Sequence, residues 1–401
     1  MMLKNKDWNR RTFLKTSASV LAFPFVTPFN GFAQFVLTQY NNSKMITDKN
    51  TTLLPTRKLG TLEVSAMGLG CMNFHHAFYP RTTKQEAIKV IQRAYELGVT
   101  FFDTAINYGP FLSEESVGEA VAPFRDKIIL ATKFGYGYDE NGKNIGLNSQ
   151  PDYIKKMTDA SLKRLKTDYI DLYYQHRVDP TVPIEDVAGV IQDMIKEGKV
   201  RHWGLSEAGE ATIRRAHKVQ PLTAIQNEYA VWTRDPEGEV LSTCEELGIG
   251  FVPWSPIGKG FLSGTITPNT KFDPRLDVRY NSPRFTTENL KANWKIVSLL
   301  QHIGAKKYAT PTQIALAWLM TKYPFIVPIP GTTSIKHLEE NVNTLQVEFT
   351  GDDFNEIENE FAKIGVHGER TTAQLSSVHD IGANLGTSSK GTHGNSPLPK
   401  K

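Results

Sequence analysis

Four side chains able to transfer or direct a proton stand at or just after the ends of short apolar runs: Asp103, Tyr108, Lys133 and His176. A free tyrosine has a pKa of about 10, too high for an efficient proton donor at neutral pH. A neighbouring ammonium group stabilises the phenolate and lowers that pKa. We therefore expect Lys133 to act on Tyr108, while an ion pair with Asp103 holds the lysine in place. His176 adds a donor that positions a carbonyl oxygen or relays a proton. Such a group suits protonation of an oxygen whose carbon accepts a hydride.

Each of these residues, taken alone, also has a purely structural explanation. Asp103 could cap the following turn, and Lys133 could simply neutralise it. A lone histidine such as His176 is more often a core or loop residue than a catalyst, and Tyr108 beside Gly109 suits packing at a rim. All four at the ends of consecutive apolar runs favour the proton-transfer interpretation.

The elements that would position these residues alternate along the chain. Short apolar runs typical of buried strands recur at 66–70, 100–103, 128–133, 169–176, 200–206, 224–227, 250–254 and 326–330. Amphipathic segments with helical spacing lie between them, and the first begins with a capping-box pattern, Thr83 to Glu86. Repeated strand–helix units predict an α/β fold, a single-domain (β/α)8 TIM barrel over residues 57–365. Active sites in this fold lie at the carboxyl ends of the strands. Long loops at 135–149 and 258–290 would fall on that face.

Both ends of the chain lie outside this repeat. The stretch NRRTFLK (9–15) and the moderately apolar sequence after it resemble a Tat export signal over residues 1–33. Pro24 and Pro28 argue against a spanning helix. We therefore expect a folded, periplasmic protein exported by the Tat machinery, with no stable membrane anchor; a basic terminus that matches by chance is the alternative. Residues 34–56 suit a polar tether, and the tail, 366–401, is expected to be largely disordered.

Composition limits the partners and the chemistry. The chain has 46 Lys and Arg and 42 Asp and Glu. Five of these basic residues and one of the acidic residues lie in residues 1–33, so the rest of the chain has equal numbers of basic and acidic residues. The absence of a net charge after residue 33 gives no indication of nucleic-acid binding. Cys71 and Cys244 fall in different parts of the predicted fold, which favours two free thiols over a disulfide. No cysteine or histidine spacing indicates a metal site.

These motifs resemble those of the aldo-keto reductases, and most closely the bacterial and plant branch that reduces aldehydes and ketones with NADPH. The similarity spans about 57–365 and rests on GLGCM (68–72), FFDTAINYG (101–109), ATKFG (131–135), DLYYQHRVDP (171–180), GKVRHWGLSE (198–207), IQNEY (225–229), WSPIGKGFLSG (254–264), IPGTT (329–333) and LEEN (338–341). The resemblance implies that Tyr108 is the general acid and that Lys133 lowers its pKa. It also implies that Asp103 anchors the lysine and that His176 orients the substrate oxygen.

The resemblance further implies NADP(H) as cofactor, with NAD(H) left open. Ser206, Glu207 and Gln226 match positions that hold the nicotinamide carboxamide, and Trp254 matches the ring that stacks on the nicotinamide. The loop over the pyrophosphate corresponds to Ser255, Pro256, Ile257, Gly258, Gly260, Leu262 and Gly264. The remaining positions of the predicted cofactor site, most of them around the adenosine end, are Gly70, Gly331, Thr332, His337, Glu340 and Asn341.

The chain departs from the family pattern at two places. Thr333 and His337 stand where relatives often carry Arg or Lys for the 2′-phosphate, and Glu207 stands where many have Asn. A carboxylate accepts from the carboxamide but does not donate, so that contact is expected to be reorganised.

The predicted function is NAD(P)H-dependent reduction of a small-molecule aldehyde or ketone without a metal. Tyr229 and Trp232 either line the substrate pocket or pack in the core. The rival hypothesis, from another class, is an exported dinucleotide-binding or interaction protein that keeps the fold but has little catalysis. The intact set of four argues against the rival.

Overall fold

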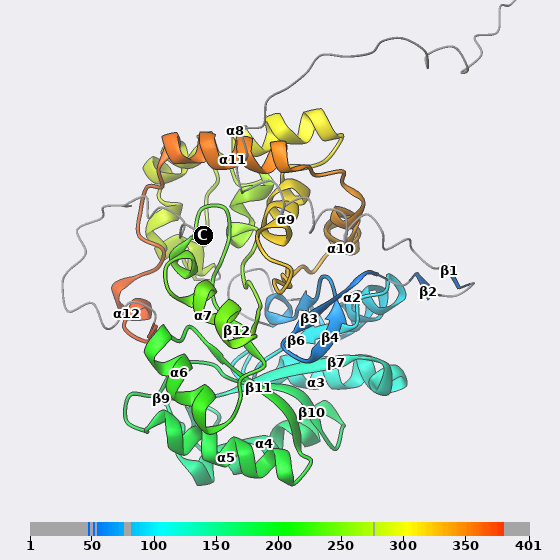
Figure 1. The fold of residues 1–401 in the computed structure, drawn as a ribbon, viewed down its shortest axis with the longest axis vertical. Coiled ribbons are helices and arrows are strands. Elements are labelled where there is room, and N and C mark those ends of the chain that lie inside the picture. Colours follow the sequence, from blue (N-terminus) through cyan, green and yellow to red (C-terminus); the bar gives the residue numbers. More distant parts are fainter. Residues whose placement is uncertain (1–46, 49–50, 53, 76–81, 276, 381–401) are drawn as a thin grey trace, which may run out of the picture.

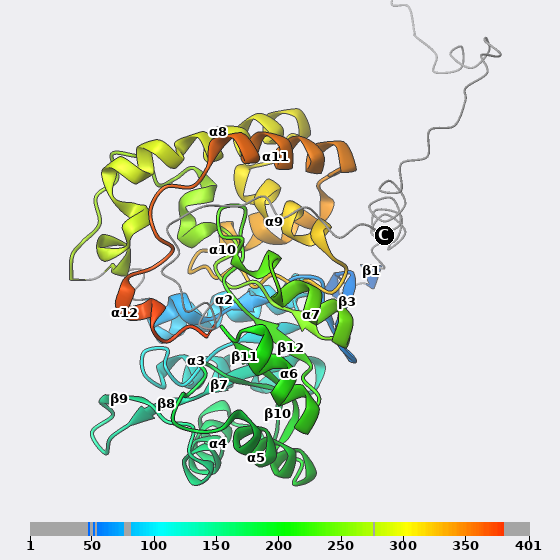
Figure 2. The same ribbon diagram turned by 60° about the vertical axis from the view of Figure 1, so that its left-hand side comes forward.

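A computed structural model describes residues 47–48, 51–52, 54–75, 82–275 and 277–380. The predicted export signal and most of the tether lie outside the described residues, so both stay predictions. Figures 1 and 2 show a curled central sheet surrounded by helices, with two helices, at 287–307 and 351–364, side by side across one end in both views.

Seven parallel strands form the central sheet, and each lies in or overlaps one of the predicted apolar runs: β5 (Leu69–Gly70), β6 (Phe101–Asp103), β7 (Ile129–Phe134), β10 (Ile170–Gln175), β11 (Val200–Ser206), β12 (Ala224–Gln226) and β13 (Gly250–Phe251). Strands that follow one another in this series are neighbours in the sheet. The register pairs Asp103 with Ala131, and Tyr174 with both Lys133 and Gly204. The polar residues that end these strands therefore lie along one rim.

The eighth apolar run, 326–330, closes the sheet into a barrel without becoming a regular strand. On one side Val327 N–H donates to the carbonyl of Phe251 over 2.9 Å. On the other side Gly68 N–H donates to the carbonyl of Pro328 over 3.0 Å. Pro328 and Pro330 have no N–H to give to a ladder, which explains why the pairing is incomplete. The predicted (β/α)8 barrel is confirmed, with the eighth strand reduced to single contacts.

Helices cover the outside of the barrel. Six of them coincide with amphipathic segments between the apolar runs: α2 (Lys84–Glu96), α4 (Pro151–Leu165), α5 (Ile184–Lys196), α6 (Glu210–Val219), α7 (Val240–Leu247) and α9 (Pro311–Lys322). The others are α3 (Leu112–Val121), α8 (Thr287–Lys307), α10 (Ile335–Val342), α11 (Gly351–Ile364) and α12 (Ala373–Ser376). The capping box at the start of α2 is confirmed: Thr83 Oγ1 accepts from Glu86 N–H, and the Glu86 carboxylate accepts from Thr83 N–H.

A hairpin closes one end of the barrel. Strands β3 (Thr56–Leu59) and β4 (Leu62–Ser65) pair antiparallel, and their side chains Leu59, Leu62 and Val64 pack into the core inside the barrel. The other residues of this inner core are Phe101, Ala131, Leu172, Tyr174, Ala224, Val252, Val327 and Ile329. A Cβ added at Gly250, the first residue of β13, would lie 2.4 Å from the Cα of Leu59. The hairpin therefore covers the amino ends of the strands and leaves the opposite rim for a site.

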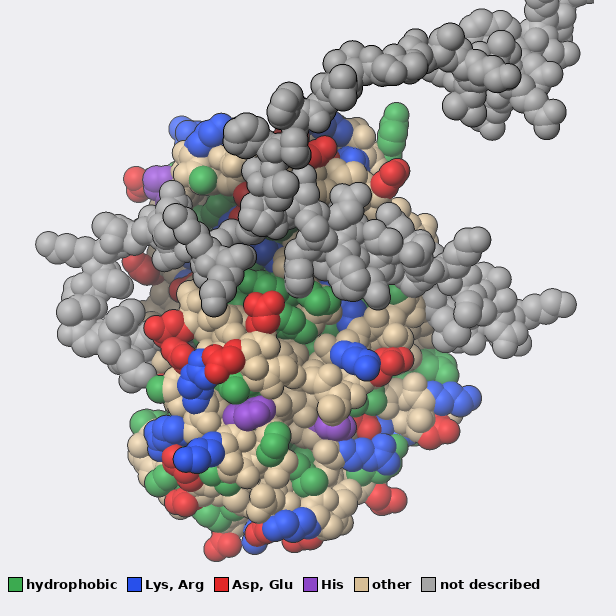
Figure 3. Space-filling view, in the orientation of Figure 1, with side chains coloured by type: hydrophobic (Ala, Val, Ile, Leu, Met, Phe, Trp, Pro, Cys, Tyr) green, Lys and Arg blue, Asp and Glu red, His purple; other side chains and the backbone are tan. Residues whose placement is uncertain are grey.

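The outer surface shows no charge segregation on the face seen in Figure 3, where basic and acidic side chains are interspersed below the grey segments. Among the described helices none is both long and apolar enough to cross a bilayer. The two cysteines, Cys71 and Cys244, are buried and free, as predicted.

The long loops and the tail are more structured than the sequence suggests. Residues 135–149 include a hairpin of β8 (Tyr136–Tyr138) and β9 (Asn144–Leu147); β1 (Thr47–Asp48) and β2 (Thr51–Thr52) form another near the start. The expectation of a disordered tail is wrong for residues 366–380, which carry α12 and bury Arg370 against carboxylates of the barrel. Residues 381–401 lie outside the described chain.

Candidate active site

Three of the four predicted proton-transfer residues share one hydrogen-bonded cluster. The Lys133 ammonium donates to the Asp103 carboxylate, to the Thr104 carbonyl over 2.9 Å and to the Tyr108 hydroxyl over 3.2 Å. Asp103 is the last residue of β6 and Lys133 lies near the end of the adjacent β7. Tyr108 reaches the cluster from the turn between β6 and α3.

Burial governs the electrostatics of this cluster. The Lys133 side chain is 0% exposed and that of Asp103 is 2% exposed. Burial raises the pKa of Tyr108, and the Lys133 ammonium opposes that rise without reversing it. Lys133 thus lowers the pKa of Tyr108, as expected, but not below its ordinary value, because removing water from the phenolate costs more than the ammonium returns. Tyr108 holds its proton at neutral pH.

His176 directly follows β10, and its ring lies against that of Tyr108. Its backbone N–H donates to the Phe134 carbonyl over 2.8 Å, which fixes the chain after the strand. The imidazole lies edge-on to the Tyr108 ring, with ring centroids 5.7 Å apart. It is also edge-on to Tyr136, at 5.3 Å. Tyr136 belongs to the β8–β9 hairpin and follows the ATKFG motif directly, the only sign of its role in the sequence.

Two residues expected to hold a nicotinamide carboxamide also contact protein groups. Gln226 donates to the second oxygen of Asp103 over 2.8 Å, so it helps to fix the carboxylate that holds the lysine. Ser206 accepts from the Arg177 guanidinium over 3.2 Å. Arg177 is a site residue that the sequence reasoning missed, although it directly follows His176 in a matched motif.

Glu207 is the third such residue and is fully enclosed. Its backbone takes the left-handed conformation, with φ of 57°, and its N–H donates to the Asn227 side chain over 2.7 Å. One carboxylate oxygen accepts from Trp254 Nε1 over 2.8 Å and from the Glu228 N–H over 2.7 Å. The other oxygen pairs with Arg370. Burial alone would raise the pKa of Glu207, but the charge of Arg370 above all lowers it to about 2.

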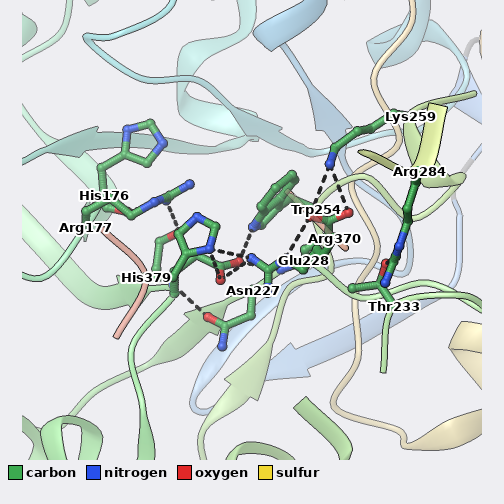
Figure 4. A network of polar contacts seen from close by, with 12 residues as sticks. His176, Arg177, Asn227, Glu228, Thr233, Trp254, Lys259, Arg284, Arg370 and His379 are labelled. Carbon is green, nitrogen blue, oxygen red and sulfur yellow. Dashed lines mark hydrogen bonds and ion pairs between the residues drawn. The ribbon is translucent and has the colours of Figure 1, made fainter. Parts of the chain in front are cut away.

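A second buried carboxylate lies beside the first. Glu228 accepts from Arg370 Nε over 3.1 Å and pairs with Lys259 at 3.3 Å. Figure 4 shows Arg370 beside Trp254, with Lys259 reaching Glu228 from the other side and His379 close to the guanidinium. Burial lowers the pKa of Lys259, with Glu228 opposing the change. Neither Arg370 nor His379 was predicted to belong to a site.

The segment after Trp254 has the backbone of an anion cradle. Five of its residues have positive φ: Ser255, Gly258, Lys259, Gly260 and Gly264. Left-handed residues close together turn successive N–H groups to one side and favour anions there. Residues 258–263 form 3₁₀ turns that are interrupted at Lys259 and Gly260, and the side chains of Phe261 and Leu262 within the segment are buried.

Trp232 and Tyr229 pack rather than face a ligand. Trp232 is 2% exposed and stacks on Phe261 at a centroid distance of 4.7 Å. Tyr229 is 0% exposed, and its hydroxyl donates to Glu237 over 2.7 Å. Of the two alternatives left by the sequence, the structure favours core packing for both.

The adenosine-end residues gather around the start of α10. Ser334 caps the helix by accepting from His337 N–H, and Thr332 accepts from Ser334 N–H over 3.1 Å. Asn341 is buried on the inner side of α10, Glu340 is half-buried and His337 is exposed. A Cβ on Gly70 would lie 2.8 Å from the carbonyl of Ile329, and a Cβ on Gly331 would lie 2.8 Å from that of Gly70. These two glycines allow the backbone at 329–331 to lie directly against β5.

Comparison with known proteins decides the family. The profile of the aldo/keto reductase family matches residues 66–360. The chain belongs to this family. It is also 44% identical over 304 residues to the Glycine max protein named "Probable aldo-keto reductase 1", covering 75% of this chain and 87% of that one.

Solved aldo-keto reductases have the same fold. The glycerol dehydrogenase AKR11B4 from Gluconobacter oxydans aligns with a TM-score of 0.71 and 25% identity, covering 77% of this chain and 95% of that one. The holo form of AKR11C1 from Bacillus halodurans aligns with a TM-score of 0.64 and 27% identity, covering 79% and 99%. Both neighbours support the barrel described above.

The residues of this aldo-keto reductase fit a nicotinamide dinucleotide. The left-handed loop beside Lys259 suits a pyrophosphate, the capped start of α10 suits a further anion, and the Trp254 ring offers a flat apolar surface. The described residues contain no group of His, Cys, Asp and Glu side chains placed to bind a metal ion.

Proposed function

We propose that this aldo-keto reductase reduces an aldehyde or ketone with NAD(P)H and uses Tyr108 as the general acid. The observation that carries the proposal is the position of Lys133, whose ammonium contacts both the Asp103 carboxylate and the Tyr108 hydroxyl inside the barrel rim. A bound nicotinamide supplies the hydride. The protein must then supply a proton to the carbonyl oxygen and stabilise the charge left behind.

Lys133 stabilises the negative charge that remains after the proton has been transferred. Tyr108 starts as the neutral phenol, because burial raises its pKa. As it gives its proton to the developing alkoxide, a phenolate forms 3.2 Å from a fixed ammonium. A preorganised charge in a dry site stabilises that transition state more than the ground state. Asp103 and the Thr104 carbonyl hold the ammonium at that point.

His176 supplies the second contact to the substrate oxygen. Its ring is held edge-on between the Tyr108 and Tyr136 rings, so its orientation is fixed before substrate arrives. A donor from a second direction orients the carbonyl and strengthens as charge develops on its oxygen.

The dinucleotide would run from the barrel centre to α10. Trp254 would contact the face of the nicotinamide, and the loop 255–264 would bind the pyrophosphate. Gly331, Thr332 and the start of α10 would bind the adenosine end. Both carboxylate oxygens of Glu207 accept from protein groups, and one of the two amide N–H groups of Gln226 donates to Asp103. Ser206, which accepts from Arg177 and keeps its own proton, therefore remains the hydroxyl donor for the carboxamide.

The choice between NADPH and NADH depends on the few groups that could contact a 2′-phosphate. Lys336 and the amino end of α10 offer positive potential for a 2′-phosphate. Thr333 and His337 do not supply the bidentate guanidinium that makes such recognition strong. We therefore propose a preference for NADPH that is modest, with NADH also accepted.

We further propose that the enzyme is exported folded, through the Tat machinery, to the periplasm. The support is the NRRTFLK stretch in the sequence. Export of a folded protein would carry the dinucleotide out with it. Replacing Arg10 and Arg11 by lysine should retain the protein in the cytoplasm; equal recovery from the periplasm would refute the proposal.

A steady-state assay tests the proposed reaction. Wild type and Tyr108→Phe are compared for NADPH oxidation with a panel of aldehydes and ketones. We expect turnover by wild type and a loss of about 10²-fold or more in the variant. Equal and negligible oxidation by both would favour the rival, a dinucleotide-binding protein with little catalysis.

A further inference from the structure

The chain after α11 returns across the carboxyl ends of the strands. We call residues 366–380 the C-terminal strap. At its start His367 exchanges two hydrogen bonds with the Asn293 side chain of α8, at 2.8 and 2.9 Å. At its end Asp380 donates its backbone N–H to the Glu207 carbonyl over 2.9 Å, and its carboxylate accepts from Gly209 N–H over 2.9 Å. The strap is thus fastened at both ends.

Arg370 fastens the middle of the strap inside the rim. Its guanidinium, 9% exposed, joins Glu207 after β11 to Glu228 after β12. His379 Nδ1 lies 3.1 Å from the same guanidinium. One arginine therefore satisfies two buried carboxylates on neighbouring elements. Removing one partner of such a group leaves the others uncompensated, at a cost much larger than that of a surface pair.

The strap reaches the nicotinamide side of the site through Glu207. The oxygen of Glu207 that does not pair with Arg370 accepts from Trp254 Nε1 over 2.8 Å. Arg370 and Lys259 lie 5.9 and 5.7 Å from the centre of the same indole. Figure 4 shows these side chains gathered around the Trp254 ring. The strap therefore pairs with the carboxylate that holds the Trp254 ring.

We propose that Arg370 is a positioning residue for dinucleotide binding and that the C-terminal strap is a permanent wall of the cofactor site. The inference rests on the proposed function. Glu207 acts through Trp254 and does not itself hold the carboxamide, because both of its oxygens are engaged by protein groups. The strap stays docked when the dinucleotide enters, since lifting it would strip Arg370 from two buried carboxylates.

Dinucleotide binding without a carbonyl substrate is the test. NADPH and NADH are titrated by tryptophan fluorescence into wild type, Arg370→Met and Arg370→Lys. Arg214→Met is the matched control, because Arg214 also joins two carboxylates but on the exposed surface of α6, with Glu210 and Glu246. Circular dichroism checks folding, and hydrogen exchange of residues 366–380 reports whether the strap stays docked.

We expect wild type and Arg214→Met to bind alike and Arg370→Met to bind about tenfold more weakly, with faster exchange in the strap. The KM for the dinucleotide should rise while that for the carbonyl stays constant. Arg370→Lys keeps the positive charge, but a lysine cannot bridge both carboxylates as the arginine does. Its dinucleotide affinity should therefore lie between those of wild type and Arg370→Met. If Arg370→Met does not fold, Arg370→Lys carries the test with the same direction.

The outcomes separate the inference from the function on which it rests. Unchanged or tighter binding by a folded Arg370→Met would overturn the inference; tighter binding would mean that the strap covers the site. No dinucleotide binding by wild type would overturn the proposed function as well. Binding by wild type with carbonyl turnover absent would leave Arg370 in its role but remove the reductase assignment.

Discussion

The Lys133 ammonium lies 3.2 Å from the Tyr108 hydroxyl, and its charge is already balanced by Asp103. The pair is neutral as a whole before any phenolate forms. The site can therefore exclude water without holding an unpaired charge, and the same ammonium then stabilises the phenolate.

Replacing Lys133 by methionine should separate catalysis from folding. The variant leaves Asp103 buried without its cation, so we expect unfolding to become easier by about 3–5 kcal/mol and turnover to fall about 10²- to 10⁴-fold. Adding Asp103→Asn should restore much of the stability but none of the turnover. Urea denaturation and steady-state kinetics measure the two effects. Recovery of turnover in the double variant would contradict the assigned role.

Gln226 is expected to matter through Asp103 and not through the carboxamide. Gln226→Leu removes a hydrogen bond to a buried carboxylate, worth about 1.5–3 kcal/mol. We predict a lower unfolding midpoint and reduced kcat, with little change in dinucleotide affinity. A large loss of affinity with normal stability would instead place the amide on the cofactor.

Docking of the C-terminal strap should weaken in acid. Burial above all lowers the pKa of His379 to about 4, with Arg177 and Arg370 lowering it further and Glu207 opposing them. A released histidine binds a proton near its ordinary pKa of about 6.5, whereas the docked one does not, so docking is strongest above that pH and weakens from about 6.5 down to about 4. Glu207, with its pKa lowered to about 2, adds a further loss from about pH 4.5 downward.

Hydrogen exchange of residues 366–380 at pH 7 and pH 5, corrected for intrinsic rates, checks this dependence. Wild type should lose protection at pH 5. His379→Gln, which has no proton to gain, should show the same protection at both values. Equal protection of wild type at both would contradict the buried neutral histidine.

Gly258 should tolerate no side chain. Its φ is 57°, and an added Cβ would meet Trp232 Nε1 at 2.6 Å. We expect Gly258→Ala to weaken dinucleotide binding by disturbing the loop over the pyrophosphate. Gly142→Ala is the matched control, since Gly142 also has positive φ, 75°, but its Cβ would meet nothing within 4 Å. Backbone strain of about 1–2 kcal/mol is common to both. Equal binding by the two variants would show that the Trp232 contact has no effect.

Cys71 and Cys244 should behave as two inert thiols. Burial raises the pKa of both well above the ordinary range, so thiolate is scarce in the folded protein. A thiol reagent should label neither in native protein and both in denaturant, whatever compartment the protein is purified from. Detection of a disulfide would contradict the separation of the two residues in the fold.

The sequence predicts well what local patterns determine. Helix α4 begins at a proline, Pro151, and α7 ends at Leu247, directly before Gly248. The proton-transfer cluster was predictable because its members lie at or shortly after strand ends, and parallel strands in chain order bring such residues to one rim. The incomplete eighth strand follows from two prolines that a run-length pattern alone does not weigh.

The strap was not predictable for the opposite reason. Its few apolar residues suggest disorder, yet what fixes it is one arginine whose partners, Glu228 and Glu207, lie 142 and 163 positions earlier. No local pattern records such a pairing. The net rise in the pKa of Tyr108 was not predictable either, because the amount of water excluded around a phenol depends on the assembled rim.

Transfer of a labelled hydride tests the central claim most directly. Wild type and Tyr108→Phe are each loaded with NADPH carrying deuterium at the transferable position and mixed with a reactive aldehyde in a single turnover. We predict one deuterium on the carbinol carbon of the alcohol formed by wild type. Tyr108→Phe should bind NADPH with similar affinity and form product at least about 10²-fold more slowly. Alcohol without deuterium, or equal rates for the two proteins, would contradict hydride transfer with Tyr108 as the proton donor.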